Sequence, residues 1–264
     1  MCTNLQPRLI SIRSSSKLQR TQKQIHIMPV TAGPIYPGIK DGLVFAIDPA
    51  NKDSWVGPTS NNVNNLCTYN SNFSGSIQND TSGSFGISSS FTFDGVDDKI
   101  DASMVKLNYD GASGFSQTPT YSFSMWARHN GDFTGNFQEI VLGNLVSNVY
   151  NFQGFFAYHG TGTDLTLRID STFGSTQLGT DWHNITGVND KENGRKIYYL
   201  DGVEEVNIAS SSVTNLSLIL ADTSRPNYDP WIGEIGPFLF YQKALTAKEA
   251  LQNYNRVKGR FGLS

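Results

Sequence analysis

The chain contains little charge and little cysteine for its length of 264 residues. Lys, Arg, Asp and Glu together make up 16% of it, below the roughly 25% typical of soluble domains. The two cysteines, Cys2 and Cys67, are too few for a disulfide framework, and Cys2 lies in the N-terminal tail. No run of about 18 apolar residues is present, so the sequence predicts no membrane-spanning helix.

Positive charge is scarce outside the first 27 residues. This segment holds five basic residues and no acid, so it carries a formal charge of +5. The rest of the chain holds 15 basic against 23 acidic residues, a formal charge of −8. Because nucleic-acid binding depends on neutralising phosphates, an acidic body argues against nucleic acid as the main partner.

The N-terminal segment also lacks the apolar stretch that a secretory signal requires. We therefore expect a basic, disordered arm over residues 1–28, followed by one domain over residues 29–264. Two alternatives stay open. Translation begins at Met28, where the regular pattern starts, or the basic segment is a targeting sequence.

In place of charged residues, the chain is rich in Gly, Ser, Asn and Thr. These residues favour turns and short strands. Phe91–Phe93, Tyr121–Trp126 and Leu165–Ile169 alternate between apolar and polar residues, which predicts strands with one buried face. Residues 51–90 predict long loops with one or two weak strands. Further strands are expected at Leu43–Ile47, Trp182–Val188, Lys196–Leu200, Val203–Val206, Leu216–Leu220 and Trp231–Tyr241.

Two of these strands are joined by Asp201-Gly202, a strong signal for a tight hairpin because both turn residues need a positive φ. Pro237 lies within the last predicted strand. Since proline cannot donate to a sheet, it predicts either an edge strand or a bulge there.

One helix is predicted near the C-terminus. Thr246 and Glu249 form a capping-box pattern at its start, and Gly259 is the expected C-cap. Many short strands with one short helix predict an all-β protein, a two-sheet antiparallel β-sandwich (jelly roll) with one short C-terminal helix.

Five segments in order resemble motifs of laminin-G-like jelly rolls, of the concanavalin A-like lectin and glucanase class. They are Phe93–Asp98, Tyr121–Trp126, Trp182–Ile185, Ile197–Gly202 and Ile232–Tyr254. The beginning and end of the domain look like versions found in tailed-phage virion proteins. This resemblance implies a decoration, fibre or adhesion role in a virion or outside the cell. The implied partners are a cell-surface or capsule glycan and other virion subunits.

The turn after the first alternating strand holds three acids, Asp94, Asp97 and Asp98. Carboxylates clustered in a turn suit a hard cation such as calcium. The other interpretation is a solvated turn, in which Asp94 accepts backbone hydrogen bonds and Gly95 adopts a positive φ. Both interpretations stay open.

The resemblance also implies one structural calcium ion near the final strand, the only cofactor expected here. Relatives often carry acids at the positions that Gly236 and Pro237 occupy in this chain. Glu234 is the acid that remains nearby, and it is the fourth candidate ligand.

The four tryptophans are candidates for stacking on sugar rings. Trp126 and Trp182 lie within strand patterns and are expected in the core. Trp55 and Trp231 lie beside loops, so they are the candidates for glycan binding. Asn62, in a neighbouring loop, is the candidate that adds hydrogen bonds.

The sequence contains no catalytic motif that we recognise. Its histidines lack metal-ligand spacing, and no nucleophile elbow or phosphate-binding loop is present. The Glu-x-Asp-x-x-Glu run of glucanases in this class is also missing. We therefore predict a non-catalytic recognition module, with two alternatives kept: a structural virion protein without a ligand, and a glycoside hydrolase built from distant acids.

Overall fold

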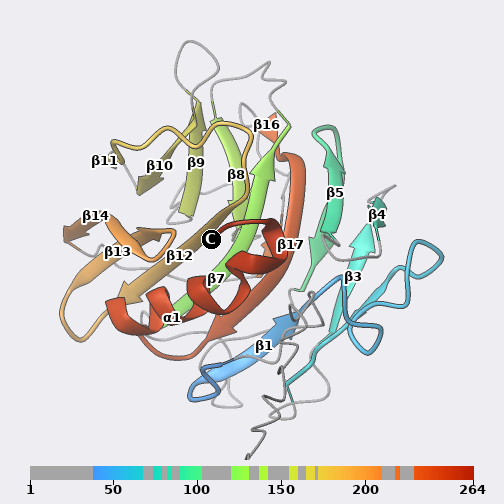
Figure 1. The fold of residues 1–264 in the computed structure, drawn as a ribbon, viewed down its shortest axis with the longest axis horizontal. Coiled ribbons are helices and arrows are strands. Elements are labelled where there is room, and N and C mark those ends of the chain that lie inside the picture. Colours follow the sequence, from blue (N-terminus) through green and yellow to red (C-terminus); the bar gives the residue numbers. More distant parts are fainter. Residues whose placement is uncertain are drawn as a thin grey trace, which may run out of the picture. The chain divides into compact units, whose positions relative to one another are not determined.

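Two β-sheets make up most of the described part of this computed structural model (Figure 1). The described residues belong to the unit spanning residues 31–264, and the predicted arm, residues 1–28, lies outside them. The described ranges are 38–67, 74–78, 82–84, 90–102, 120–130, 137–141, 155–159, 165–169, 172–209, 218–220 and 229–264.

The first sheet contains most of the strands that the sequence predicted. Its order is β14 (Val203–Ala209), β13 (Arg195–Leu200), β12 (His183–Asp190), β7 (Tyr121–His129), β17 (Ile232–Tyr241), β5 (Ser90–Asp94) and β4 (Ser82–Ser84), with β1 (Leu43–Ile47) also paired to β17. All of these pairs are antiparallel.

The second sheet uses shorter strands, and three of them fall in the polar region of residues 51–102. Its order is β11 (Thr172–Phe173), β10 (Leu165–Ile169), β9 (Phe155–His159), β8 (Phe137–Val141), β15 (Ile219–Leu220), β6 (Lys99–Asp101), β3 (Ser74–Gln78) and β2 (Asn62–Asn64). A two-residue strand, β16 (Asp229–Pro230), pairs with β8 in parallel. The predicted two-sheet β-sandwich is confirmed.

Strand β7 shows how the core is built. Tyr121, Phe123 and Met125 point into the core between the sheets, as the alternating pattern predicts. The opposite face is buried as well. Ser122 accepts a hydrogen bond from the backbone N–H of Leu245 at 2.9 Å, and Trp126 lies under the C-terminal helix. Both faces of this strand are therefore covered, one by the second sheet and one by the C-terminal segment (Figure 1).

That segment contains helix α1 (Ala247–Val257), which lies across the outer face of the first sheet (Figure 1). The predicted capping box of Thr246 and Glu249 is confirmed. The prediction that Gly259 caps the C-terminus of α1 was wrong. A 3₁₀ turn, η1 (Lys258–Phe261), follows the helix directly, and Gly262 is the residue that adopts the left-handed conformation after it. Phe261 packs 4.6 Å from Trp126 between ring centroids, which favours the extra turn. Among the described residues, no helix is long and apolar enough to cross a membrane.

Two turn predictions are also confirmed. Asp201 and Gly202 have φ angles of +52° and +81°, as a hairpin turn between β13 and β14 requires. The register of β17 against β7 shifts between Ile235 and Phe238, so Pro237 lies in a bulge. Because β17 pairs with β7 on one side and with β5 and β1 on the other, Pro237 is not on an edge strand.

Candidate functional site

The two tryptophans predicted to face a glycan are both in the core. Trp55 is 1% exposed and Trp231 is 2% exposed. The Trp55 ring lies 5.1 Å from that of Phe91, and its Nε1 donates to the backbone oxygen of Ser60 at 2.9 Å. The rings of Trp231 and His129 pack edge to face, with their centroids 5.2 Å apart. Neither ring is available to stack on a sugar, contrary to the expectation from their loop context.

The predictions for the other two tryptophans and for Asn62 have different outcomes. Trp126 and Trp182 are buried, so their predicted place in the core is confirmed. Asn62 lies on β2, at one end of the second sheet, and its side chain is exposed. It therefore stays a candidate for hydrogen bonding to a ligand, without Trp55 as a platform beside it.

The acidic turn follows β5 directly. The backbone N–H of Asp94 donates to Oδ2 of Asp98 at 2.9 Å, and the N–H of Val96 donates to Oδ1 of Asp94 at 2.8 Å. Gly95 has a φ of +78°. The geometry expected of a hydrogen-bonded turn is confirmed, and the backbone itself holds two of the three carboxylates in place.

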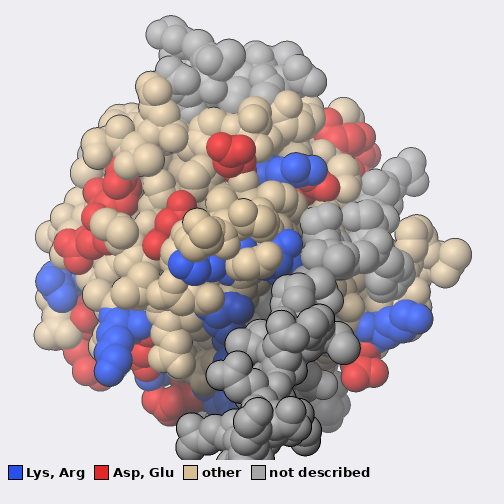
Figure 2. Space-filling view, viewed as in Figure 1, with Lys and Arg blue, Asp and Glu red and all other residues tan. Residues whose placement is uncertain are grey.

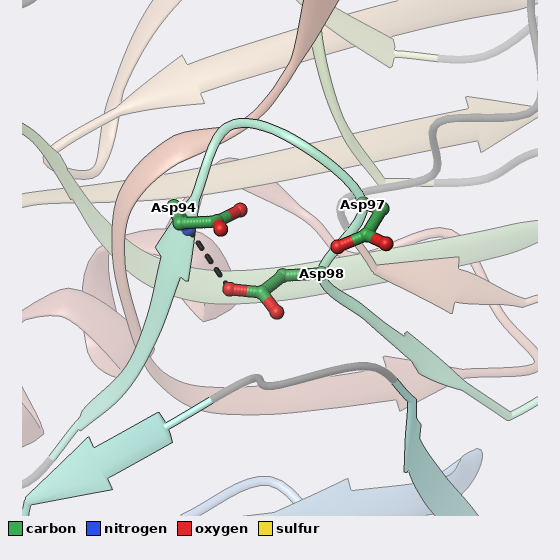
Figure 3. A group of neighbouring side chains, drawn as sticks. All are labelled: Asp94, Asp97 and Asp98. Carbon is green, nitrogen blue, oxygen red and sulfur yellow. Dashed lines mark hydrogen bonds between the residues drawn. The ribbon is translucent and has the colours of Figure 1, made fainter.

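The same turn brings its three carboxylates together. One ligand oxygen from each of Asp94, Asp97 and Asp98 lies within 4.8 Å of the others. Figure 3 shows the three groups converging across the turn. Asp98 is buried, whereas Asp94 and Asp97 are exposed. Because calcium takes six to eight oxygens, the three acids fit as a partial ligand set, with water supplying the rest.

Glu234, the fourth predicted ligand, is not part of that cluster. Its carboxylate forms an ion pair with Arg128 and accepts a hydrogen bond from Oγ of Ser90 at 2.8 Å. Gly236 lies beneath Phe261, where a side chain would collide with the ring at 2.9 Å. The missing acid at this position therefore has a packing reason.

A small hollow of about 350 Å³ lies beside this ion pair, which we call the β17 hollow. Gly233 is one of its lining residues and has a φ of +148°, and a Cβ there would meet the Arg128 carbonyl oxygen at 2.3 Å. The hollow is lined by Arg128, His129, Asn130, Thr180, Gly233 and Glu234.

A wider groove of about 660 Å³ lies on the outer face of the first sheet, and we call it the β13 groove. Ile197 and Tyr199 of β13 form its floor. One end is lined by Glu192 and Asn193 of the β12–β13 turn and by Arg195, and Glu204 of β14 lines it further along, opposite Tyr199. A wall is formed by the segment 242–247, which joins β17 to α1. No sequence motif marks these residues, because the groove exists only once β13 and the C-terminal segment pack together.

The segment 242–247 is held firmly over the sheet. Oγ of Ser122 donates to the backbone oxygen of Lys243 at 2.7 Å and accepts from the N–H of Leu245. The Lys243 ammonium group contacts Glu249 at 2.7 Å and Asp41 at 2.9 Å. The hydrogen bond to Glu249 is the main cause of the raised pKa of Lys243. The groove thus has a fixed wall, and a fixed wall favours ligand binding without rearrangement.

Basic and acidic side chains are interspersed on the face of the molecule that carries α1 (Figure 2). Among the described residues on that face, no broad area of one sign dominates.

No family model matches the chain, and no curated protein matches its sequence. Solved structures do share its fold. Domain 4 of AbnA, a GH43 extracellular arabinanase from Geobacillus stearothermophilus solved in complex with arabinotriose, has a TM-score of 0.55 and 18% identity. The match covers 80% of this chain and 98% of that domain.

Two further structures are similar to comparable degrees. The binding domain of Paraclostridial Mosquitocidal Protein 1 has a TM-score of 0.58 and 18% identity, over 84% of this chain and 55% of that one. The Trypanosoma rangeli sialidase has a TM-score of 0.55 and 9% identity, over 84% of this chain and 34% of the enzyme. The chain thus spans about half of one protein and a third of the other. At these identities the likeness establishes the fold alone, a β-sandwich jelly roll.

Proposed function

We propose that this domain is a non-catalytic carbohydrate-binding module and that the β13 groove holds the glycan. The main observation that supports this proposal is the groove itself. Its volume of about 660 Å³ lies within the roughly 300–1,000 Å³ typical of ligand sites. Its walls present carboxylate, guanidinium and amide groups, which make paired hydrogen bonds with sugar hydroxyls.

The fold likeness supports the same function. The arabinanase domain in complex with arabinotriose is matched over 98% of its length, so a domain of this architecture and size has accommodated an oligosaccharide. At 18% identity this says nothing about which residues bind. The location of the site in this chain therefore rests on the groove.

The carboxylates of the groove favour binding over hydrolysis. Glycoside hydrolysis needs one carboxyl group kept protonated by burial or by a neighbouring charge. Glu192 and Glu204 are exposed. Asp190 is buried, but it accepts hydrogen bonds from both the backbone and the side-chain nitrogen of Asn193. None of the three is arranged as a general acid.

A glycan array followed by calorimetric titration tests this proposal. We expect at least one oligosaccharide to bind, and we expect Arg195→Ala and Glu204→Gln to weaken it about tenfold each, as loss of a charged hydrogen bond does. Asn62→Ala, on the other sheet, should bind normally. If no glycan binds, the result favours the alternative hypothesis, a structural protein without a ligand. If Asn62→Ala alone loses binding, the site lies at β2 instead.

We further propose that the module belongs to the laminin-G-like family and acts in a virion or at a cell surface, in adhesion or decoration. The five sequence motifs support this setting, with glycans or neighbouring virion subunits as partners. Mass spectrometry of purified virions from the source strain tests it directly. Absence of the chain from such particles would leave a cell-surface or secreted module.

A further inference from the structure

The β17 hollow lies on the outer face of the first sheet, at the opposite end from the β13 groove. Arg128 follows Trp126 by two residues on β7, so both side chains point to this face. Strand β12 begins at His183, which pairs with Ala127 beside the hollow, and it ends at Asp190, which lines the groove. At about 3.3 Å per residue, the two ends of β12 lie roughly 23 Å apart. The hollow is therefore separate from the groove.

The guanidinium group of Arg128 is held on two sides. Its Cζ lies 5.2 Å from the ring centroid of Trp182, and that ring packs in turn 4.3 Å from the ring of Phe261. Nε of Arg128 donates to Oε2 of Glu234, the residue opposite it on β17, and Oε1 of Glu234 accepts from Oγ of Ser90. A side chain fixed in this way loses little conformational freedom when a ligand binds.

The pair with Glu234 leaves the outer end of the guanidinium group available. The pair uses Nε, and no described residue accepts a hydrogen bond from Nη1 or Nη2 of Arg128. The side chain is 45% exposed, and it lines the hollow. Two terminal nitrogens in one plane match the two oxygens of a carboxylate, which is the geometry of a bidentate pair.

The other lining residues limit the size and the charge of a ligand. The volume of about 350 Å³ is near the lower end of the roughly 300–1,000 Å³ typical of ligand sites, so it suits one sugar ring rather than a long chain. Thr180 is exposed and adds a hydroxyl group. Because the formal charges of Arg128 and Glu234 cancel, the geometry of hydrogen bonding selects the ligand here, and a long-range field does not.

We propose that the β17 hollow binds the carboxylate of an acidic sugar, a uronate, through Nη1 and Nη2 of Arg128. The hydroxyl of Thr180 donates to an oxygen of the same sugar. The inference rests on the proposed function in one respect, that a sugar carries the carboxylate. It adds a second binding site to the domain and assigns a ligand class to it.

The experiment compares an acidic trisaccharide with its neutral ester. Trigalacturonate and its methyl ester are titrated by calorimetry against the whole chain. The ester keeps the sugar rings and hydroxyls but loses the two equivalent carboxylate oxygens. We expect the acid to bind about tenfold more tightly, as the gain of charged hydrogen bonds predicts.

Variants at the hollow locate the effect. Arg128→Lys keeps the positive charge but loses the planar pair of donors, so it should reduce the affinity for the acid to about that for the ester. Thr180→Val, at an exposed position, should weaken binding a few-fold and leave the melting temperature unchanged. The matched control is Arg256→Lys on the exposed side of α1, which should bind the acid normally. Equal binding of acid and ester, or undiminished binding in Arg128→Lys, overturns the inference.

The two proposals fail differently. Suppose that the array yields a glycan whose binding Arg195→Ala weakens, yet trigalacturonate does not bind. Then the β13 groove is a carbohydrate site and the uronate site is wrong. If Arg195→Ala weakens trigalacturonate binding and Arg128→Lys does not, the acid lies in the groove and the inference again fails. If neither the array nor trigalacturonate gives binding, both proposals fail.

Discussion

His183 and Asp201 are joined at 2.7 Å, between Nδ1 of the imidazole and Oδ2 of the carboxylate. On its other side, Nε2 of His183 lies 2.7 Å from the backbone carbonyl oxygen of Leu178. Both partners are acceptors only, and a neutral imidazole has a single N–H. The ring therefore satisfies both contacts only as an imidazolium, which ties the loop before β12 to the β13–β14 hairpin.

This arrangement predicts a loss of stability at alkaline pH. Burial lowers the pKa of His183, but the hydrogen bond and charge of Asp201, the Leu178 carbonyl and the charge of Asp181 together raise it above its ordinary value. A folded pKa above the unfolded one means that the stabilisation is complete below about pH 6.5 and is lost as the pH rises through the folded value.

Urea unfolding between pH 6 and 9 measures this effect. We expect the free energy of unfolding to fall as the pH rises through this range, because the folded state loses a proton that it binds more tightly than the unfolded chain does. In His183→Gln the corresponding slope should be absent, because glutamine does not titrate. A wild-type slope that persists in the glutamine variant would assign the pH dependence to another group.

A second prediction concerns the buried ion pair between Arg260 and Asp48. Nη1 of Arg260 lies 2.8 Å from Oδ1 of Asp48, and the two side chains are 3% and 1% exposed. Arg260→Met leaves a buried carboxylate without its cation, so we expect a loss of about 3–5 kcal/mol in unfolding free energy.

The control for that variant is Arg256→Met, which removes an exposed cation from α1 and should change stability by less than about 0.5 kcal/mol. Adding Asp48→Asn to Arg260→Met should cost less than the sum of the two single changes, because the stranded charge disappears. Additive losses would mean that the pair does not act as a unit.

The sequence predicted many of the strands and the local turns because their signals are local, but it did not predict β8 or β9. The alternation at Tyr121–Trp126, the hairpin at Asp201-Gly202 and the capping box at Thr246 each depend on residues a few positions apart. All three are confirmed. Local patterns did not predict that the polar face of β7 is buried. That burial depends on Ser122 meeting the backbone of residues more than 120 positions away.

The candidate site was harder to predict for the same reason. Loop-like neighbours suggested that Trp55 is exposed, but turn hydrogen bonds to the Asn51 carbonyl bring its backbone back against the sandwich. The β13 groove joins residues 190–204, most of which were predicted as a hairpin, to residues 242–247, and no local pattern in either segment predicts that the two pack together. Three of the acids predicted to bind a metal do lie together, because they belong to one turn.

A third prediction tests the close contact between β17 and β7. A Cβ on Gly233 would lie 2.3 Å from the Arg128 carbonyl oxygen, and φ there is +148°. Both atoms belong to the central strands, so neither can move without disturbing the sheet. We expect Gly233→Ala to cost about 3 kcal/mol or more, measured by thermal and urea unfolding.

The matched control is Gly259→Ala, because Gly259 has no positive φ and a Cβ there meets nothing within 4 Å. Alanine at that position, in the 3₁₀ turn η1, should leave the melting temperature unchanged or raise it slightly. Equal stability of the two alanine variants would show that β17 can shift to relieve the contact.

The last prediction concerns calcium at the turn of Asp94, Asp97 and Asp98. Three carboxylates with oxygens within 4.8 Å of one another repel, and a divalent cation would relieve that repulsion. With Glu234 engaged by Arg128, the acids supply only part of a calcium shell. We therefore expect a weak site, with a Kd of about 10⁻⁴–10⁻³ M.

Such an ion would stabilise the fold without taking part in binding chemistry. An ion bound only by the folded state stabilises it by RT ln(1 + [L]/Kd), which is about 0.4–1.4 kcal/mol at millimolar calcium for this range of Kd. Calcium should therefore raise the melting temperature by a few degrees, and a chelator should reverse the rise. Asp98→Asn should abolish the calcium effect, whereas Asp53→Asn should keep it. A melting curve that is identical in millimolar calcium and in chelator would leave the turn as one held by its own hydrogen bonds, since Asp94 and Asp98 already accept backbone N–H groups.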